Sequence, residues 1–579
     1  VNNITYSDQV VDSPTNNFAT LNPLWQDSSI TLQEGNLRSS RNANMNRPSQ
    51  STISLGTGKW YFEALDQYTT GNQIGVEWEG ADVETHVHTS GIKAYTWNSS
   101  GSTYAEGTYQ SGNNGGSVAS GARIRMVAYD GATGKLWGGA NGTWGSSGNP
   151  AAGTNESMTV PAAYRDKMHF VVATENSSTS QGIVANFGQD SSFAGLKTAQ
   201  GNQDSNDIGD FYYEPPTGFL ALCTDNLPDV AVTPSEHFNT LLYTGNGSSG
   251  RSITGVGFEP DLVWIKNRSS ASTNHALADS VRGDGKTLFS DLTNAESTNT
   301  SRHTSLDSDG FTIGNNDDVN KNTDSIVAWN WKAGTSVSGS TTGSGTAQSY
   351  TGSVNSDAGF SIIKYTGNGT DGMQVPHHLG VIPDAIFIKS LTLQSWNCFF
   401  PNALGADKGL QLNNTGAQDG PFYSTHLSDT MPTTSLVTLG NGAMTNTFAD
   451  GVGQDYIMYC WANKDGYSKI GTYETNGASG DNPGAFVYTG FRPAFVIIKS
   501  VDHTNSYTSW VMYDNKRNGY NRDNEYVFAD TSEAEMSTYI IHFYSNGFQV
   551  YDNYHATNNS GTYMYIAFAE TPFKYSNAR

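Results

Sequence analysis

A few residue clusters in this sequence have the types and spacing that could bind a metal ion. His86-Val87-His88 on a strand would point both imidazoles to one face, with Glu84 beside them by period two. That set could supply three zinc ligands, and a solvated strand face is the alternative. Asp- and Asn-rich turns at 307–310 and 315–318 could bind calcium, but they lack the twelve-residue loop spacing and its closing Glu. We predict no metal site and no cofactor, and leave calcium in these turns open.

Catalytic arrangements are equally sparse. Glu77-Trp78-Glu79 puts two carboxylates on one strand face, and glycoside hydrolysis needs such a pair about 5–9 Å apart. The segment 280–287 is similar to a phosphate loop, but Ser280 stands in place of the first Gly and no strand–loop–helix context is visible. Neither Gly-x-Ser-x-Gly nor His-Glu-x-x-His occurs. We therefore predict that the protein is not an enzyme.

Tryptophan side chains offer a different chemistry, because an exposed indole can stack on a sugar ring while Asn, Asp and Ser bind its hydroxyls. The candidates are Trp97, Trp137, Trp144, Trp264, Trp396 and Trp510. For a strand residue such as Trp264, a place in the core is the alternative. Trp396 and Trp510 lie in variable stretches outside the expected strands. We therefore take these two as the candidate ligand-binding residues.

Composition narrows the class of protein. The 579 residues include 31 basic and 54 acidic side chains, so the formal charge is −23, and only 15% of residues are charged. This shortage of Lys and Arg argues against nucleic-acid binding over a broad face. No run approaches 18 apolar residues, which argues against membrane insertion. Much Gly, Ser, Thr and Asn with little Leu, Lys or Glu disfavours long helices, and 12% aromatic residues disfavour disorder.

Short strands and turns fill the first segment, 1–228. In the run Lys59 to Leu65, period two places Trp60, Phe62 and Ala64 on one face. Asn141-Gly142 favours a type I′ hairpin turn between two further strands. These signals, without a helical period, predict an antiparallel β-sandwich.

Several motifs of this segment occur in the order found in SPRY domains: Gly58-Lys59-Trp60-Tyr61-Phe62-Glu63, Ile74-Gly75-Val76, Gly134-Lys135-Leu136-Trp137, Asn141-Gly142-Thr143-Trp144 and Asn186-Phe187-Gly188-Gln189. The segment therefore resembles a SPRY domain, a concanavalin A-like two-sheet sandwich, in a variant associated with tailed phages of marine bacteria. The flanking stretches 12–23 and 218–228 resemble the lead-in and exit of those phage proteins. In relatives the lead-in often follows a laminin-G-like sandwich. The first residue is not Met, so we expect the chain to begin inside a longer product, and we leave open whether an upstream domain is missing.

An internal repeat occupies the rest of the chain. Tyr243-Thr244-Gly245-Asn246-Gly247 recurs at 365–369 and, more loosely, at 473–477. Each copy is followed by a landmark strand that ends in lysine, at Lys266, Lys389 and Lys499, and later by an aromatic strand. The spacings between these lysines are 389 − 266 = 123 and 499 − 389 = 110 residues. Units of about 110 residues are large enough for their own cores.

We therefore predict an all-β protein of tandem antiparallel β-sandwiches: a SPRY-like domain at 1–228 and smaller related domains at 229–338, 339–466 and 467–579. The Ser/Thr/Gly run 335–349 is expected to be a linker or long loop at the start of the second repeat. The repeat resembles an uncharacterised domain that follows the SPRY-like domain in the same phage proteins. Ala328-Trp329-Asn330-Trp331-Lys332-Ala333-Gly334 is its most specific piece.

Together the resemblances imply a bacteriophage virion structural protein, most simply a tail fibre or surface appendage that binds host-surface glycan during attachment. Its partners would be other virion proteins and the glycan, and it would be assembled in the host cytoplasm and exposed on the virion. Analogy with phage fibres implies a homotrimer, whose contacts must come from sandwich faces because no heptads occur. The alternatives are a capsid-decorating fibre without a receptor role, a polysaccharide-degrading enzyme and a secreted bacterial adhesin.

The stretches after the landmark lysines, 267–275, 390–397 and 500–510, differ in length and composition. Similar strands with divergent loops are typical of a scaffold that carries binding loops. If the repeats bind glycans, these loops should line exposed grooves, with Trp396 and Trp510 as stacking platforms. The alternative is that the loops pack against neighbouring domains.

Overall fold

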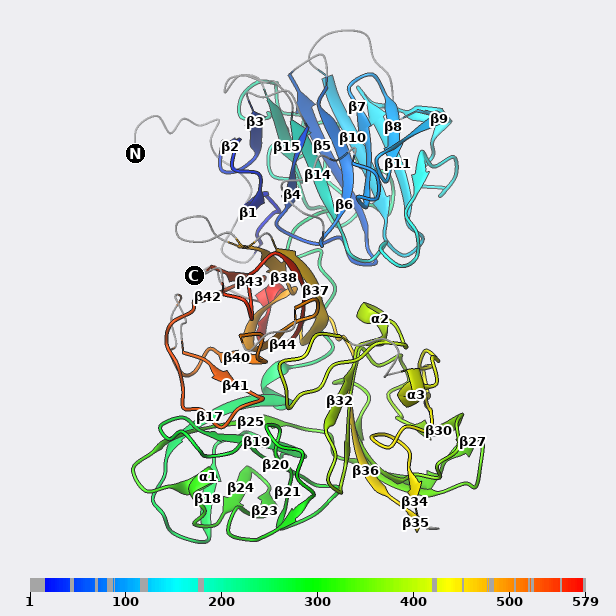
Figure 1. Ribbon diagram of the computed structural model, residues 1–579. Coiled ribbons are helices and arrows are strands. Elements are labelled where there is room, and N and C mark those ends of the chain that lie inside the picture. Colours follow the sequence, from blue (N-terminus) through cyan, green and yellow to red (C-terminus); the bar gives the residue numbers. More distant parts are fainter. Residues whose placement is uncertain are drawn as a thin grey trace. The chain divides into compact units, whose positions relative to one another are not determined.

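The computed structural model describes residues 16–575, except 42–45, 68–70, 81–86, 88, 115–122, 175–181, 419–423, 450–451, 476, 478–483, 504–506, 519–520, 522–524 and 552–553 (Figure 1). The chain divides into two compact units, Val1–Asp229 and Val230–Arg579. Strands dominate both units, so the predicted all-β class is confirmed. Among the described residues, no helix has the length and apolar character needed to cross a membrane.

The first unit is built from short strands: β1 (Leu21–Gln26), β2 (Ile30–Gln33), β3 (Arg38–Arg41), β4 (Arg47–Ser51), β5 (Lys59–Asp66), β6 (Gln73–Trp78), β7 (Ala94–Asn98), β8 (Ser102–Ala105), β9 (Thr108–Asn114), β10 (Arg123–Asp130), β11 (Lys135–Ala140), β12 (Thr143–Trp144), β13 (Met158–Thr159), β14 (Met168–Thr174), β15 (Ile183–Asn186) and β16 (Leu220–Ala221). One sheet has the order β1-β4-β14-β6-β7-β8-β9. The other has the order β12-β11-β10-β5-β15-β3-β2, with β13 on β11 and β16 on β5.

The two sheets of this unit pack face to face. Phe62 of β5 lies 4.4 Å from Phe170 of β14, ring centre to ring centre. The opposite face of β5 is also buried, because Tyr61 packs on Phe211 and neighbouring apolar side chains of the segment before β16. The strand predicted at 59–65 is present, but period two does not separate a buried face from an exposed one.

The second unit contains three large sheets, one per repeat. In the first repeat the strands are β17 (Phe238–Thr244), β18 (Arg251–Thr254), β19 (Leu262–Asn267), β20 (Ala276–Asp279), β21 (Lys286–Thr287), β22 (Ser297–Thr298), β23 (His303–Asp307), β24 (Gly310–Ile313) and β25 (Ser325–Trp331), with helix α1 (Asp317–Asn320). The large sheet has the order β17-β25-β19-β20, and a small one has the order β18-β24-β23.

The second repeat contains β26 (Thr335–Ser340), β27 (Thr342–Gly343), β28 (Ser349–Asn355), β29 (Phe360–Thr366), β30 (Met373–Pro376), β31 (Ala385–Ser390), β32 (Trp396–Phe399), β33 (Leu436–Leu439), β34 (Phe448–Ala449), β35 (Val452–Gly453) and β36 (Asp455–Trp461), with α2 (Pro401–Leu404) and α3 (Ser424–Leu427). The third contains β37 (Ser468–Thr475), β38 (Phe486–Tyr488), β39 (Phe491–Ser500), β40 (Val511–Asp514), β41 (Val527–Phe528), β42 (Ile541–Tyr544), β43 (Gly547–Val550) and β44 (Gly561–Pro572).

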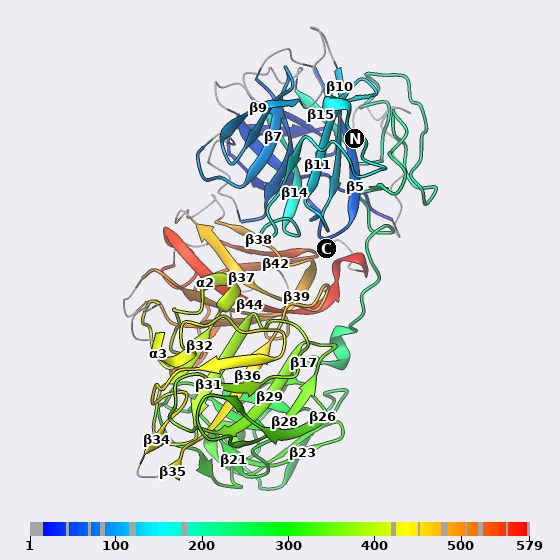
Figure 2. The ribbon, with the colours of Figure 1, turned by 90° about the vertical axis from the view of Figure 1, so that its right-hand side faces the viewer.

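These two repeats have the same plan as the first. Their large sheets have the orders β26-β28-β29-β36-β31-β32 and β37-β44-β39-β40-β41, and their small sheets have the orders β27-β30-β33 and β38-β43-β42. The expectation of a linker at 335–349 is wrong, because β26 and β28 form a hairpin on the edge of β29 (Figure 2). Its apolar Val337 and Tyr350 pack on the core of the second repeat, which fixes the hairpin despite its Ser- and Gly-rich sequence.

Each large sheet of the second unit is buried on both faces. In β25, Ile326 and Ala328 face the small sheet of their own repeat, whereas Val327, Trp329 and Trp331 join a core shared by the three repeats. The same alternation holds along β36 and β44. Figure 1 shows the green, green-to-yellow and orange-to-red strand sets of this unit next to one another. The shared core contains side chains from all three sets.

Candidate functional site

The stretches that follow the landmark strands form joints between repeats. Trp396 and Trp510 are fully buried. The indole N–H of Trp396 donates to the carbonyl oxygen of Phe289 in the first repeat at 2.7 Å, and that of Trp510 donates to Gln411 in the second at 2.9 Å. The prediction that these two side chains are exposed stacking platforms is therefore wrong. Their contacts are those of the alternative in which the loops pack against neighbouring domains.

In the first repeat a histidine, His275, makes the contact with a neighbouring repeat that Trp396 and Trp510 make in the other two. His275 comes directly before Ala276, which pairs with Ile265, the residue before Lys266. In the second repeat Trp396 pairs with Lys389 itself. Nδ1 of His275 accepts the indole N–H of Trp264 at 2.9 Å, so Nε2 carries the proton that is donated to Phe528 in the third repeat, also at 2.9 Å. The first repeat thus contacts the third, the third the second, and the second the first. The three repeats form a closed ring.

The landmark lysines brace the same joints. Nζ of Lys266 donates to the carbonyl oxygen of Ser532 at 3.0 Å, Nζ of Lys389 to Thr293 at 3.4 Å, and Nζ of Lys499 to Thr415 at 3.2 Å, each in the neighbouring repeat. Burial lowers the pKa of Lys266 and Lys499 to about 8 and that of Lys389 to about 7. These lysines are structural groups rather than exposed ligand contacts.

The other candidate catalytic and calcium-binding groups have structural partners. Glu77 is buried and accepts a hydrogen bond from Gln50, while Glu79 is only partly exposed and lies beyond the end of β6. In the turn at 307–310, Asp309 accepts the backbone N–H groups of Gly255 and Gly257. Glu84, His86 and His88 lie outside the described residues.

The remaining candidate motifs are also accounted for by local structure. In the segment 280–287, Arg282 forms an ion pair with Asp279, so this segment is a braced turn rather than a phosphate loop. Asn316, in the turn at 315–318, caps helix α1 by accepting the N–H of Asp318. Of the other tryptophans, Trp97, Trp137 and Trp264 are buried and Trp144 is partly exposed.

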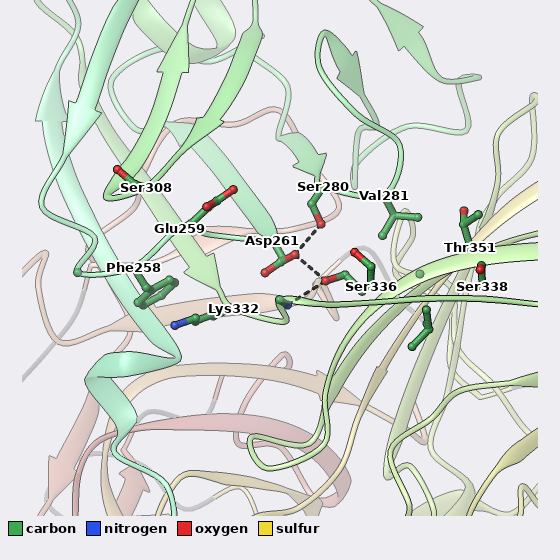
Figure 3. Close-up of a pocket in the computed structure, with 15 residues that line it drawn as sticks. Phe258, Glu259, Asp261, Ser280, Val281, Ser308, Lys332, Ser336, Ser338 and Thr351 are labelled. Carbon is green, nitrogen blue, oxygen red and sulfur yellow. Dashed lines mark hydrogen bonds between the residues drawn. The ribbon is translucent and has the colours of Figure 1, made fainter.

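An open groove of about 1030 Å³ lies between the first repeat and the β26–β28 hairpin (Figure 3). Ser336 pairs with Ser353 and Ser338 with Thr351 across the hairpin, and directly paired residues share a face of the sheet. These four hydroxyl groups therefore form one wall of the groove. Val337 and Gly352 of the hairpin also line the groove, and the other lining residues are Gly257, Phe258, Glu259, Asp261, Ser280, Val281, Ser308, Lys332 and Gly334.

Asp261 fastens the floor of this groove. One carboxylate oxygen accepts the hydroxyls of Ser280 at 2.6 Å and Ser353 at 2.7 Å, and the other accepts the backbone N–H of Ala333 at 2.8 Å. The carboxylate therefore holds the hairpin against the first repeat. The equivalent Asp384 accepts the N–H of Asn463, which matches the contact between Asp261 and Ala333. The Pro-Asp of the landmark sequence is therefore a signal for that backbone contact.

Hydroxyl groups dominate the exposed part of the groove. Ser308, Ser336, Ser338 and Thr351 are exposed and have small side chains, whereas Phe258 is buried. Glu259 is the exposed carboxylate of the lining, and Lys332 is half-buried. Such a surface offers many hydrogen-bond donors and acceptors with little charge, which suits a neutral polyhydroxylated ligand.

Fold and site together define an all-β protein whose second unit is a closed ring of three related sandwiches with a hydroxyl-lined groove. Residues 233–572 match the family described as "Domain of unknown function (DUF7483)", and the chain belongs to that family. No curated protein sequence matches the chain.

Two solved structures are similar to part of the chain. The SPRY domain of human HERC1 is 13% identical, with a TM-score of 0.22, over 28% of this chain and 96% of its own. The PSpry domain of TRIM65 is 13% identical, with a TM-score of 0.22, over 29% of this chain and 90% of its own. The first unit is a two-sheet sandwich by its own strand pairing.

Proposed function

We propose that the protein is a non-enzymatic structural component of a bacteriophage virion, a tail fibre or surface appendage, that binds host-surface glycan. The hydroxyl-lined groove between the first repeat and the β26–β28 hairpin is the observation that carries the glycan-binding part. The placement on a phage particle, exposed at its surface beside other virion proteins, rests on the sequence resemblance.

The groove supports a saccharide ligand through its fixed geometry. Its wall is a hydrogen-bonded hairpin and its floor is locked by Asp261, so the backbone that carries Ser338 and Thr351 is held in place before a ligand arrives. Binding then costs little ordering entropy, which favours affinity for a ligand that gains only modest energy per contact. The joints of the ring give the same rigidity to the frame behind the groove.

Binding is favoured over catalysis by the state of the carboxylates in the groove. Asp261 accepts three hydrogen bonds from the protein and is buried, so it is ill placed to transfer a proton to a substrate. Glu259 is exposed, but it would have to act as a catalytic group without Asp261. Glycoside hydrolysis uses two carboxyl groups.

The experiment is a binding measurement of the full chain on polysaccharide purified from the surface of the host. Ser308→Arg and Thr351→Arg each place a bulky side chain in the groove, and Ser252→Arg adds the same group to an exposed position of β18 outside it. We expect each groove variant to weaken binding at least about tenfold, because an arginine that crowds the ligand needs to cost only ~1.4 kcal/mol for a tenfold change in Kd. The control should bind like the original chain.

Two results would contradict the proposal in different ways. Unchanged binding by both groove variants would exclude this groove as the site. Absence of binding to any host polysaccharide, or its depolymerisation by the chain, would exclude the glycan-binding function. The homotrimer stays a prediction, and the joints that already occupy the inner faces of the repeats leave only other surfaces for it.

A further inference from the structure

The large sheet of the second repeat ends differently from the other two. In the first and third repeats the corresponding edges are β17 and β37, whereas in the second the equivalent strand β29 is followed by β28 and then β26. The hairpin is thus an addition to this repeat alone. Within the part of the chain that the structure describes, no strand pairs with the outer edge of β26.

The outer edge of β26 presents a regular row of backbone groups. The hairpin is in unbroken register from Thr335 to Ser340, and the N–H of Thr341 donates to Gln348 at its tip. In an antiparallel pair, residues alternate between bonding the partner strand and pointing their N–H and C=O away from it. Counting back from Thr341, the groups of Ser336, Ser338 and Ser340 point away from β28.

This edge lacks the features that keep sheet edges from pairing. Such edges are blocked by Lys, Pro, bulges or a covering segment. β26 has the sequence Thr-Ser-Val-Ser-Gly-Ser and no bulge, and every residue except Val337 is exposed. By contrast, the outer strand β37 of the third repeat carries Lys469 and Glu474.

The distribution of charged residues along the chain also distinguishes the β26–β28 hairpin. The run from Ala333 to Ser356 contains no charged residue and is the longest such run in a chain of formal charge −23. Copies of so acidic a chain repel one another over most of their surface. A neutral edge with small side chains is therefore the place where two copies can approach without opposing like charges.

We propose that β26 pairs in antiparallel fashion with β26 of a second copy of this chain. In a two-fold arrangement Ser338 stands opposite Ser338 of the second copy, and Ser336 opposite Ser340. Each of these outward-pointing residues then exchanges backbone hydrogen bonds with its partner, over a strand of about 20 Å at ~3.4 Å per residue. This contact does not depend on glycan binding and does not exclude a separate three-fold contact.

The experiment measures the mass of the full chain in solution by sedimentation or light scattering between about 1 and 100 μM, the range where contacts of this size associate. We expect a concentration-dependent doubling of the 62.2 kDa mass. Ser338→Lys should abolish the doubling, because the two lysines would stand face to face, and Ser338→Glu should do the same. Mixing the two variants should restore the pair, since opposite charges then meet.

The matched control is Ser252→Lys, which adds the same charge to an exposed serine of the edge strand β18. It should leave the doubling unchanged, and all three variants should keep the melting temperature of the original chain because both serines are exposed. If the chain also forms trimers, two trimers joined through β26 would give a particle of six chains. A fall from six chains to three in Ser338→Lys would then also support the two-fold contact. A monomer throughout the range, or an assembly of any size that Ser338→Lys leaves intact, overturns the proposal.

Discussion

The hydroxyl of Tyr459 donates a 2.6 Å hydrogen bond to Oδ2 of Asp279, which links strand β36 of the second repeat to the end of strand β20 in the first. In the next joint the indole N–H of Trp329 donates to Oδ2 of Asp514 in the third repeat at 3.1 Å. Ile566 stands at the third equivalent position and has no donor. At these three equivalent strand positions, Tyr459 and Trp329 make polar contacts between repeats, whereas Ile566 lies in the shared apolar core.

The contact between Tyr459 and Asp279 should contribute measurably to stability. Tyr459→Phe removes a bond to a buried carboxylate, so we expect a loss of about 1.5–3 kcal/mol in the free energy of unfolding. The control is Tyr365→Phe, whose hydroxyl donates to the neutral carbonyl of Thr445 inside its own repeat. That variant should lose only about 1 kcal/mol. Urea unfolding of the full chain compares them, and equal losses would argue against a special role for the joint.

Trp396 should behave as a core residue. Trp396→Ala opens a large cavity at a joint, so we expect a loss of about 3–5 kcal/mol. Glycan binding, measured at a temperature where the variant is folded, should not change. Trp510→Ala should give the same pattern at the next joint, since its indole is equally buried. Retained stability with lost binding would restore the stacking hypothesis that the structure contradicts.

The strands themselves could be predicted from the sequence, but their second buried face could not. The run Ile326 to Trp331 is apolar at nearly every position, and β25 lies there as expected. An apolar run predicts a buried strand without saying what covers each face. Here Trp329 and Trp331 are covered by the other two repeats, which no pattern inside one repeat reveals.

The sequence could raise packing between repeats as an alternative, but it could not show that the three joints are equivalent or that a groove forms, and the reasons are related. His275, Trp396 and Trp510 all donate a ring N–H to a backbone carbonyl, but they follow their lysines by 9, 7 and 11 residues, so unequal loops hide the equivalence. Because each acceptor is a backbone carbonyl, the accepting residue can have any side chain, and the sequence gives no sign of it. The groove is formed by Asp261 and Ser353, which are 92 residues apart.

The first unit should be more stable in mild acid than at neutral pH because of Glu63. Its carboxylate is buried and accepts the N–H groups of Tyr212 and Tyr213 and the hydroxyl of Tyr61, and burial raises the pKa of Glu63 to about 7. The folded state therefore holds a proton that the unfolded chain releases near pH 4.5. The contribution of Glu63 to the free energy of unfolding is fully present below pH 4.5. It decreases by roughly 3 kcal/mol as the pH rises to about 7.

Glu63→Gln tests this assignment, because an amide does not titrate. The urea midpoint of the first unit, measured between pH 4.5 and 8, should fall in the original chain and stay nearly flat in the variant. Glu106→Gln is the control, since Glu106 is partly exposed and its pKa is lowered by hydrogen bonds from Lys93 and Tyr95. An unchanged slope in Glu63→Gln would show that another group titrates.

The ring should respond to pH in the opposite direction through Lys389. Its ammonium group donates to the carbonyl oxygens of Ser390, Thr392 and Thr293, and burial lowers its pKa to about 7. The unfolded chain keeps this proton up to about pH 10.5. Between these values the unfolded state binds more protons, so the free energy of unfolding rises with pH.

Lys266 and Lys499, with pKa values of about 8, act in the same direction. The urea midpoint of the second unit should therefore rise from pH 7.5 to 8.5, a range in which the tyrosines of the unfolded chain, with a pKa of about 10, stay almost entirely protonated. Lys389→Met should reduce that slope, whereas Lys332→Met, at a half-buried lysine of the groove, should leave it unchanged. A midpoint that is flat or falls over this interval, or a slope that Lys389→Met does not alter, would mean that the joint lysines do not carry the pH dependence of the ring.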